Sequence, residues 1–248
     1  MGFQDDCESA VSDIIRTEFN TRSGREVPTT DSIVQRDGAV WLTAAYLYAD
    51  MADSTGLATH FVPEDAARII RAYLAAVCKV LRERGGEIRS FDGDRVMAIF
   101  AGDDAADKAV DAGLRINWVV RKVVHPQLLL WSDAYYDKSN DGKWSLKHRT
   151  GIDVGTALIV RAGVRGHNDL VSVGDAPNIA AKLSDYKGGG ATIISNDVWE
   201  KLSYKNCFSK DSLANTDEEQ AIWTQPTIKD IGGGTWESIR TSTWLRSY

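Results

Sequence analysis

The stretch "AVWLTAAYLYADMADSTGL", residues 39–57, joins a nearly unbroken apolar run to Asp50, Asp53 and a Ser-Thr-Gly segment. An apolar run of this length predicts a buried strand over residues 39–49. Asp50 is expected where that strand stops, and the polar residues after it predict a turn into a helix. A carboxylate at the end of a buried strand is either an ordinary turn residue or a ligand-binding group, so the rest of the chain must decide.

Composition limits the possible functions. The chain has 248 residues with 43% apolar composition, enough for one large globular unit. No apolar run approaches the roughly 20 residues that span a bilayer, and the acidic start "MGFQDDCESAV" does not resemble a signal peptide. Cys7, Cys78 and Cys207 are too widely spaced for a disulfide framework or a CxxC metal site. We therefore expect a cytoplasmic protein with no membrane partner and with reduced cysteines.

The charge balance concerns possible nucleic-acid partners. A net charge of -6 and a pI near 5.3 argue against a cationic surface that tracks a phosphate backbone. We expect no nucleic-acid partner. A single nucleotide remains compatible, because metal ions and a few local cations can balance its charge.

The apolar periodicity predicts an alternation of helices and strands. The expected elements, in chain order, are an amphipathic helix at 3–19, the strand at 39–49, a helix at 63–84, two short strands within 85–100 around an Asp92-Gly93 turn, a helix at 102–124, strands at 148–155, 157–164 and 169–174, a helix at 176–186, a strand at 190–195 and a short helix at 196–202. The residues between the first helix and the first strand read as a polar link, and those at 125–147 as a less regular stretch.

This order predicts an α+β fold, a ferredoxin-like βαββαβ sandwich with extra elements. We divide the chain into an N-terminal helix and linker (1–37), a catalytic domain (38–205) and a C-terminal extension (206–248) that completes the sheet with a strand or hairpin. The N-terminal helix is expected to pack on the domain or on a second subunit.

Three segments carry candidate chemistry. Asp50 and Asp94 would converge if their strands are neighbours, and a carboxylate pair is tolerable when a hard divalent cation lies between its members. Asn178 and Lys182 are four residues apart, on one face of a helix, where an amide and an ammonium can hold a ribose and a phosphate. Taken singly, each has a simpler explanation, as turn residues or a solvated helix face.

Together, the segments "YADMADST", "GGEIRSFDGDRVMAIF" and "VGDAPNIAAK" resemble the class III nucleotide cyclase catalytic domain, in order and spacing. The resemblance covers about residues 38–205 and implies that Asp50, Asp94 and the Met51 carbonyl bind two divalent cations, Mn²⁺ or Mg²⁺. It also implies that Asn178 orients the ribose. Lys182 stands where the family usually has arginine, and an ammonium cannot make a bidentate contact with phosphate.

The same resemblance identifies substrate-binding positions. Backbone N–H groups from Ala52 through Ser54 and Thr55 to Gly56 are expected to cradle a triphosphate. Ser90 and Val171 occupy positions where purine cyclases carry base-reading residues, so the purine code is absent. Tyr48 stands where Phe is usual, and its extra bulk suits a smaller base, although it is equally explained as a core aromatic.

The runs "LYADMADST" and "GREVPTTDSI" further resemble the bacterial pyrimidine cyclases of Pycsar antiphage defence. This resemblance implies a homodimer with sites shared between subunits, UTP as the favoured nucleoside triphosphate, cyclic UMP as product, and a separate cyclic-nucleotide effector that the enzyme does not contact. The alternatives are a cytidylate cyclase making cyclic CMP, an ordinary adenylate or guanylate cyclase, and a silent cyclase-like module. The last would need a lost metal ligand, yet both aspartates are present.

Overall fold

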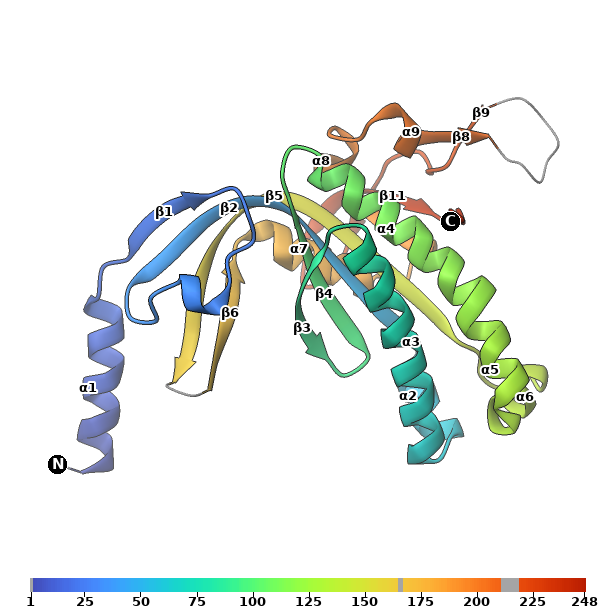
Figure 1. Cartoon of the computed structure of the whole chain (residues 1–248), viewed down its shortest axis with the longest axis horizontal. Helices are drawn as coiled ribbons and strands as arrows, with labels where there is room; N and C mark the ends of the chain where they lie inside the picture. The colour runs from blue at the N-terminus through green and yellow to red at the C-terminus, as the bar shows by residue number, and fades with distance from the viewer. Residues whose placement is uncertain (1, 165–166, 211–218) are drawn as a thin grey trace.

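The computed structural model describes residues 2–164, 167–210 and 219–248. Its main sheet has the strand order β10-β11-β7-β5-β2-β4-β3, with β1 added beside β2 and β6 beside β5 (Figure 1). A separate pair is formed by β8 and β9. The strands are β1 (Asn20–Gly24), β2 (Gly38–Ala52), β3 (Glu87–Asp92), β4 (Arg95–Ala101), β5 (Lys147–Val164), β6 (His167–Val173), β7 (Thr192–Ser195), β8 (Phe208–Lys210), β9 (Glu219–Ala221), β10 (Thr227–Asp230) and β11 (Trp236–Ser242).

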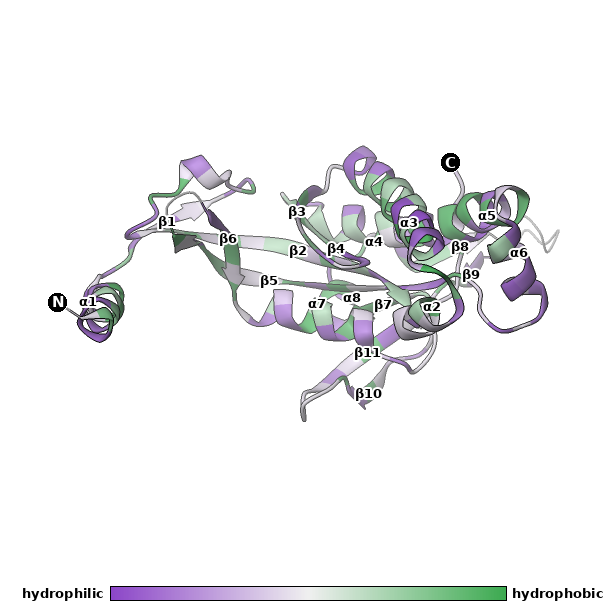
Figure 2. Cartoon of the chain, turned by 90° about the horizontal axis from the view of Figure 1, so that it is seen from below, coloured by the Kyte–Doolittle hydropathy of each residue, from purple (hydrophilic) through white to green (hydrophobic). Residues whose placement is uncertain are grey.

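Helices cover both faces of this sheet. In Figure 2, α3 and α4 lie on one side of it and α7 lies on the other. No described helix is long and apolar enough to cross a membrane. The helices are α1 (Phe3–Arg16), η1 (Thr30–Ser32), α2 (Ser54–His60), α3 (Pro63–Glu83), α4 (Ala105–Val119), η2 (Val120–Val124), α5 (His125–Trp131), α6 (Asp133–Asn140), α7 (Asp175–Asp185), α8 (Asn196–Trp199) and α9 (Tyr204–Cys207).

Strand β2 is buried on both faces, as its apolar run predicts. Ala45, Leu47 and Ala49 pack in the core beneath α3 and α4, whereas Ala44 and Tyr46 pack in the core beneath α7. Since successive side chains of a strand point to opposite faces, only a nearly all-apolar segment can fill both cores. The strand continues to Ala52. Asp50 therefore lies inside β2, two residues before its last residue, whereas the sequence predicted that the strand would stop at Asp50.

The predicted ferredoxin-like arrangement is confirmed. Strands β5, β2, β4 and β3 are adjacent and antiparallel, and α3 and α4 supply the two helical connections. The hairpin between β3 and β4 turns at Gly93-Asp94, one residue later than the predicted Asp92-Gly93 turn. Gly93 has φ of 60°, which a glycine at the first turn position adopts without strain.

Three local predictions were wrong. The expected strands at 148–155 and 157–164 form one continuous strand, β5, because β2 offers it an unbroken partner on both sides of Thr156. The expected helix at 102–124 changes after Val119 into a five-residue π-helix, η2. The stretch read as irregular contains two short helices, α5 and α6.

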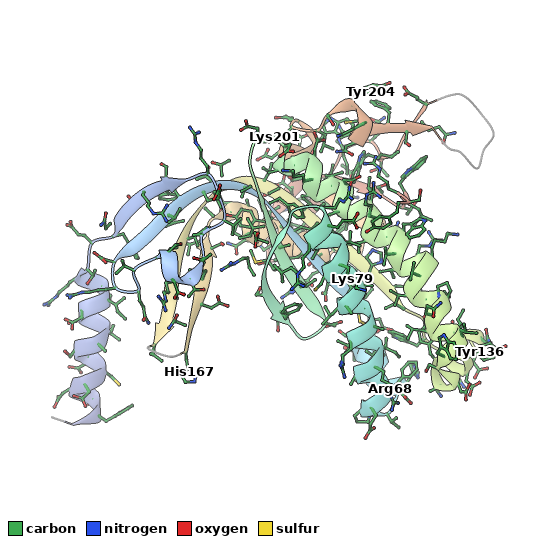
Figure 3. All side chains as sticks on the ribbon, viewed as in Figure 1. Arg68, Lys79, Tyr136, His167, Lys201 and Tyr204 are labelled. Atoms are coloured by element: carbon green, nitrogen blue, oxygen red, sulfur yellow. The ribbon has the colours of Figure 1, made fainter. Side chains whose placement is uncertain are left out.

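The N-terminal part also differs from expectation. The polar link contains β1, which pairs in parallel with β2 despite having no apolar side chain. Strands β1, β2, β5 and β6 extend as an arm away from α3 and α4, and His167 marks the tip of its β5–β6 hairpin (Figures 1 and 3). Helix α1 lies within the segment 3–19 in which a helix was expected. It has no buried residue, so it does not pack on the described part of its own chain. Packing on a second subunit stays a prediction.

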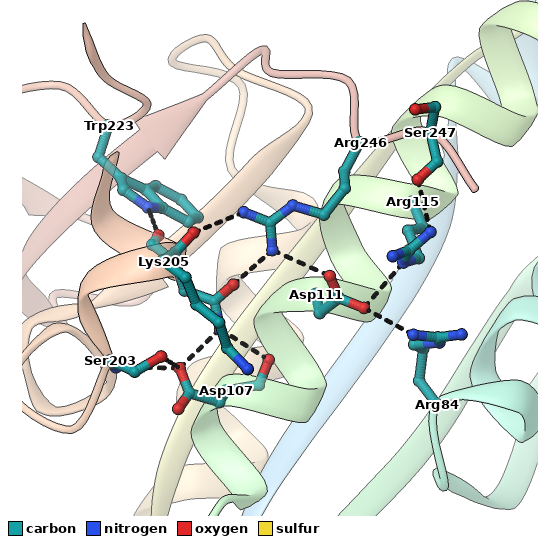
Figure 4. Close-up of polar contacts among 10 residues, drawn as sticks. Arg84, Asp107, Asp111, Arg115, Ser203, Lys205, Trp223, Arg246 and Ser247 are labelled. Carbon is teal, nitrogen blue, oxygen red and sulfur yellow. Dashed lines mark hydrogen bonds and ion pairs between the residues drawn. The ribbon is translucent and has the colours of Figure 1, made fainter. Parts of the chain in front are cut away.

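The C-terminal segment is joined to the body by hydrogen bonds and ion pairs. Strand β11 pairs with β10 and β7, which confirms the expected terminal hairpin. Figure 4 shows Asp111 of α4 in contact with three guanidinium groups, those of Arg84, Arg115 and Arg246, at 3.2, 2.8 and 2.9 Å. The domain boundaries at residues 37 and 205 stay a prediction, and residues 211–218 of the extension lie outside the described chain.

Asp111→Ala should destabilise the fold by about 2–4 kcal/mol, because three partly buried cations lose their shared carboxylate. The Arg246 and Arg115 hydrogen bonds lower the pKa of Asp111 against the effect of burial. Its contribution is therefore complete above the unfolded pKa of about 4 and is lost as pH falls through the folded pKa. Urea unfolding at pH 7 and pH 3 measures both effects.

Asp104→Ala is the matched control. Asp104 lies at the N-terminal end of α4, the helix that carries Asp111, and makes a solvent-exposed i,i+4 ion pair with Lys108. It should change the free energy of unfolding by about 0.5 kcal/mol or less. Equal losses in the two variants would contradict a specific role for the Asp111 cluster.

Candidate functional site

Asp50 and Asp94 lie close together at one end of the strands of the main sheet. Asp50 is near the end of β2, and Asp94 is in the β3–β4 turn, two residues before Val96, which pairs with Ala49. The pKa of the Asp50 carboxyl is raised to about 7, first by burial and next by the Asp94 carboxylate, against an opposite effect of Arg95. Burial also raises the pKa of Asp94. The predicted convergence of the two aspartates is therefore observed, although their role as metal ligands stays a prediction.

The environment of Asp94 fits a cation. Its Oδ2 atom is buried and has no hydrogen-bond partner among the described residues. A buried carboxylate oxygen without a partner is costly, and a divalent cation beside a second carboxylate would satisfy it. The described residues contain no group of three or more metal-ligating side chains. A pair of carboxylates suits an ion such as Mg²⁺, which takes one or two carboxylates and completes its shell with water and substrate phosphates.

Arg95 and Asp185 complete the cluster and were not predicted from the sequence. The Arg95 guanidinium lies 3.3 Å from Asp185 and 3.1 Å from Asp92, and 5.7 Å from the centre of the Tyr48 ring. Asp185 also approaches Asp50 closely enough to raise its pKa. A signal for Asp185 was present, since it follows Asn178 and Lys182 at helical spacing on the same face of α7.

The turn from β2 into α2 is fixed by Asp53. This residue has φ of 65°, and its Oδ1 accepts a hydrogen bond from the Gly56 N–H at 3.1 Å. The Trp144 indole donates to the Asp53 carbonyl at 3.0 Å. Ser54 and Thr55 are exposed in the first turn of α2, and Ala52 is still part of β2. The Gly56 N–H expected to meet a triphosphate thus donates to Asp53 in this structure.

A cavity of about 200 Å³ brings the predicted base-binding residues together. Tyr48, Ser90 and Val171, from β2, β3 and β6, all line it. Arg89 and Ser172 line it too, and neither was predicted. A regular strand would point Arg89 and Ser90 to opposite faces, but β3 has a register shift between Ile88 and Ser90. Such a bulge re-aims a side chain and leaves no recognisable signal in a single sequence.

Helix α7 presents the predicted amide and ammonium groups. Asn178 is exposed and makes no hydrogen bond to the described residues, whereas the Lys182 ammonium donates to the Thr235 hydroxyl in the loop between β10 and β11. Asp185, which approaches Asp50, lies seven residues beyond Asn178. Seven residues correspond to roughly 10 Å along a helix. Asn178 is thus separated from the carboxylates of its own chain.

Comparisons with known proteins give a consistent picture. No protein-family model matches the chain. A uridylate cyclase of Rhodovulum sp. (strain MB263) is 35% identical over 226 residues, covering 84% of this chain and 92% of that protein. A uridylate cyclase of Xanthomonas perforans is 32% identical and covers 100% of this chain and 97% of its own length. A third, from Burkholderia cepacia, is 31% identical over 98% of each chain.

Solved structures show the same fold at lower identity. The guanylyl cyclase Cya2 has a TM-score of 0.65 and 18% identity, covering 83% of this chain and 94% of its own. The adenylyl cyclase CyaB from P. aeruginosa has a TM-score of 0.63 and 19% identity, covering 85% and 97%. The fold is therefore that of the class III nucleotide cyclases, and the chain belongs to the uridylate cyclase family.

Proposed function

We propose that this chain converts UTP into 3′,5′-cyclic UMP and pyrophosphate. The observation that carries the proposal is the pair of partly buried carboxylates, Asp50 and Asp94, with one carboxylate oxygen left without a partner among the described residues. The relatives named uridylate cyclase support UTP as the substrate. In this reaction the ribose 3′-oxygen attacks the α-phosphorus of the same nucleotide and pyrophosphate leaves.

The chain's own groups would bind and orient the nucleotide. Asp50, Asp94 and the Met51 carbonyl would hold one or two divalent cations, Mn²⁺ or Mg²⁺. A cation bound there would acidify the 3′-hydroxyl and neutralise phosphate charge. Asn178 would fix the ribose, and Lys182 would balance the charge that develops on the α-phosphate. The free N–H groups of the turn after β2 would contact the triphosphate.

The chemistry of the 200 Å³ cavity supports uracil as the base. The hydroxyls of Tyr48, Ser90 and Ser172 can donate or accept, so they do not discriminate between bases. Arg89 only donates and makes no hydrogen bond or ion pair to the described residues. C4 of a pyrimidine is opposite N1, which carries the ribose. When the base enters the cavity ahead of the ribose, its C4 substituent therefore goes in deepest. This substituent is O4 in uracil, which accepts a hydrogen bond from Arg89, and N4–H in cytosine, which cannot accept one.

The distance along α7 supports a site shared between two subunits. Asn178 is far from Asp50 of its own chain, and it is exposed, as a residue that serves a partner would be. A head-to-tail homodimer would place the aspartates of one chain opposite the Asn178–Lys182 face of the other. The proposed product would act in the cytoplasm as a second messenger for a separate effector in antiphage defence, as in the Pycsar systems that the sequence resembles.

The purified protein should form cyclic UMP as its main product when it is incubated with Mn²⁺ and each of the four nucleoside triphosphates, because the cavity lacks purine-reading side chains. Chromatography with mass spectrometry identifies the products. Cyclic CMP as the main product would favour the cytidylate alternative, and cyclic AMP or cyclic GMP would overturn the pyrimidine assignment.

Arg89→Gln should lower the preference for UTP over CTP by about tenfold, since an amide can donate to O4 or accept from N4–H. The ratio of kcat/KM values for the two nucleotides measures this. Arg68→Gln, at an exposed position of α3 that does not line this cavity (Figure 3), should leave the ratio unchanged. An unaltered ratio in Arg89→Gln with normal cyclic UMP synthesis would remove Arg89 from base reading.

Mixing the inactive variants Asp50→Ala and Asn178→Ala should restore about a quarter of wild-type activity, because half of the dimers are mixed and each mixed dimer keeps one intact site. Cyclic UMP formation after subunit exchange measures the rescue. Mixing Asp50→Ala with Asp94→Ala is the control, because both changes affect the same half of the site. Rescue in the control, or no rescue in the test mixture, would argue against shared sites.

A further inference from the structure

An open apolar groove runs along α3, on the side that faces η2 and α5. Its volume is about 1010 Å³, and its α3 wall includes Ile69, Ala72 and Ala76 at helical spacing. Trp118 of α4 and Trp131 of α5 are part of the opposite wall. We propose that this groove, which we call the α3 groove, holds helix α1 of a second copy of this chain. This docking goes beyond the proposed cyclase reaction and does not depend on it.

The α3 groove exposes large apolar side chains. Trp131 is 78% exposed and Val123 is 40% exposed, although both line the groove. On the α3 wall, Ala75 is exposed, and its small side chain leaves room for a helix to approach the α3 backbone closely. An apolar surface of this kind on a globular chain is typical of a contact with another protein segment.

Helix α1 offers a matching apolar stripe. Phe3, Val11, Ile14 and Ile15 lie at helical spacing on one side of α1, and their exposed fractions are 86%, 55%, 75% and 77%. No residue of α1 is buried. A helix of 14 residues is only marginally stable in water on its own, so α1 needs a partner that covers this stripe.

The dimensions of the helix and of the groove agree. Helix α1 has 14 residues and is therefore roughly 21 Å long. The α3 residues that line the groove run from Asp65 to Glu83, which corresponds to a rise of roughly 27 Å. The whole apolar stripe can therefore lie along the α3 wall. Packing of an amphipathic helix into an apolar groove is a common mode of recognition between protein segments.

Charge favours the same pairing. Lys79 of α3 lines the groove and forms no ion pair with the described residues (Figure 3). The carboxylate of Asp65 is already paired with Arg68 at 2.6 Å, and that of Glu83 with Arg84 at 2.6 Å. Helix α1 is acidic, and its charged residues are Asp5, Asp6, Glu8, Asp13 and Arg16. A docked α1 would therefore bring carboxylates to an unpaired cation.

A second copy of the chain, and not the same chain, supplies the helix. The arm formed by β1, β2, β5 and β6 carries α1 away from α3 and α5, which lie at the opposite end of the molecule (Figure 1). A chain therefore cannot fill its own groove without rearranging the arm. Two chains that exchange α1 would fill both grooves at once and form a closed twofold assembly.

Cross-linking of the purified protein with a short bismaleimide tests this docking. Cys7 is exposed and lies on the apolar stripe, four residues after Phe3 and seven before Ile14. Ala75→Cys puts a second thiol in the α3 groove and should give a covalent dimer that joins Cys7 of one chain to position 75 of the other. Ala67→Cys is the matched control, because Ala67 is exposed on α3 but does not line the groove. It should give no such dimer.

Mass spectrometry of the linked peptides separates the outcomes. Addition of Cys7→Ser to Ala75→Cys should abolish the covalent dimer. A link between the Cys7 residues of two wild-type chains would show that α1 pairs with α1, and it would overturn the docking. A link within a single chain, or equal linking in Ala75→Cys and Ala67→Cys, would overturn it as well.

Ile14→Asp should weaken the association of two chains about a hundredfold, because it places a charge in the apolar stripe. Ser9→Asp adds the same charge on the polar side of α1 and should change the association constant by about twofold or less. Sedimentation equilibrium measures both constants, and equal values for the two variants would contradict the docking. Absence of cyclic UMP synthesis in the wild type would count against the proposed function and leave these results intact.

Discussion

Two carboxylates held side by side in a partly buried place impose the constraint on which the rest of this site depends. The pKa of the Asp50 carboxyl is raised to about 7, first by burial and next by the Asp94 carboxylate, and the Asp94 Oδ2 has no hydrogen-bond partner among the described residues. Arg95 offsets this only in part, because it is shared with Asp92 and Asp185. The sheet keeps the pair together through the β2–β4 register, so the fold maintains an electrostatic arrangement that favours binding of a divalent ion.

Much of this could be predicted from the sequence where local pattern decides the structure. The double-sided burial of β2 follows from its apolar run, the α3 helix from its periodicity and Pro63, and the placement of Asp94 from a glycine-containing hairpin. The convergence of Asp50 with Asp94 needed more than pattern, since it depends on β2 and β4 being neighbours. The resemblance to a known family supplied that pairing, which spacing alone leaves open.

The residues that escaped prediction are those positioned by distant partners. Arg89 lines the base cavity because β3 shifts register against β4. Strand β1 has no apolar side chain and exists because β2 offers it a free edge. In both cases contacts with a neighbouring strand decide the local structure, and a single sequence carries little signal of such contacts.

Lys182 illustrates how tertiary contacts can compensate for a change of residue type. An arginine at this position would approach a phosphate with a rigid two-pronged group, whereas a lysine has a flexible stem and a single charge. Here the ammonium donates to Thr235, in the loop that joins β10 to β11, and β11 is itself hydrogen-bonded to β7. The C-terminal hairpin therefore limits the directions available to Lys182. In the proposed function, this ordering would reduce the side-chain entropy that Lys182 loses when its ammonium binds a phosphate.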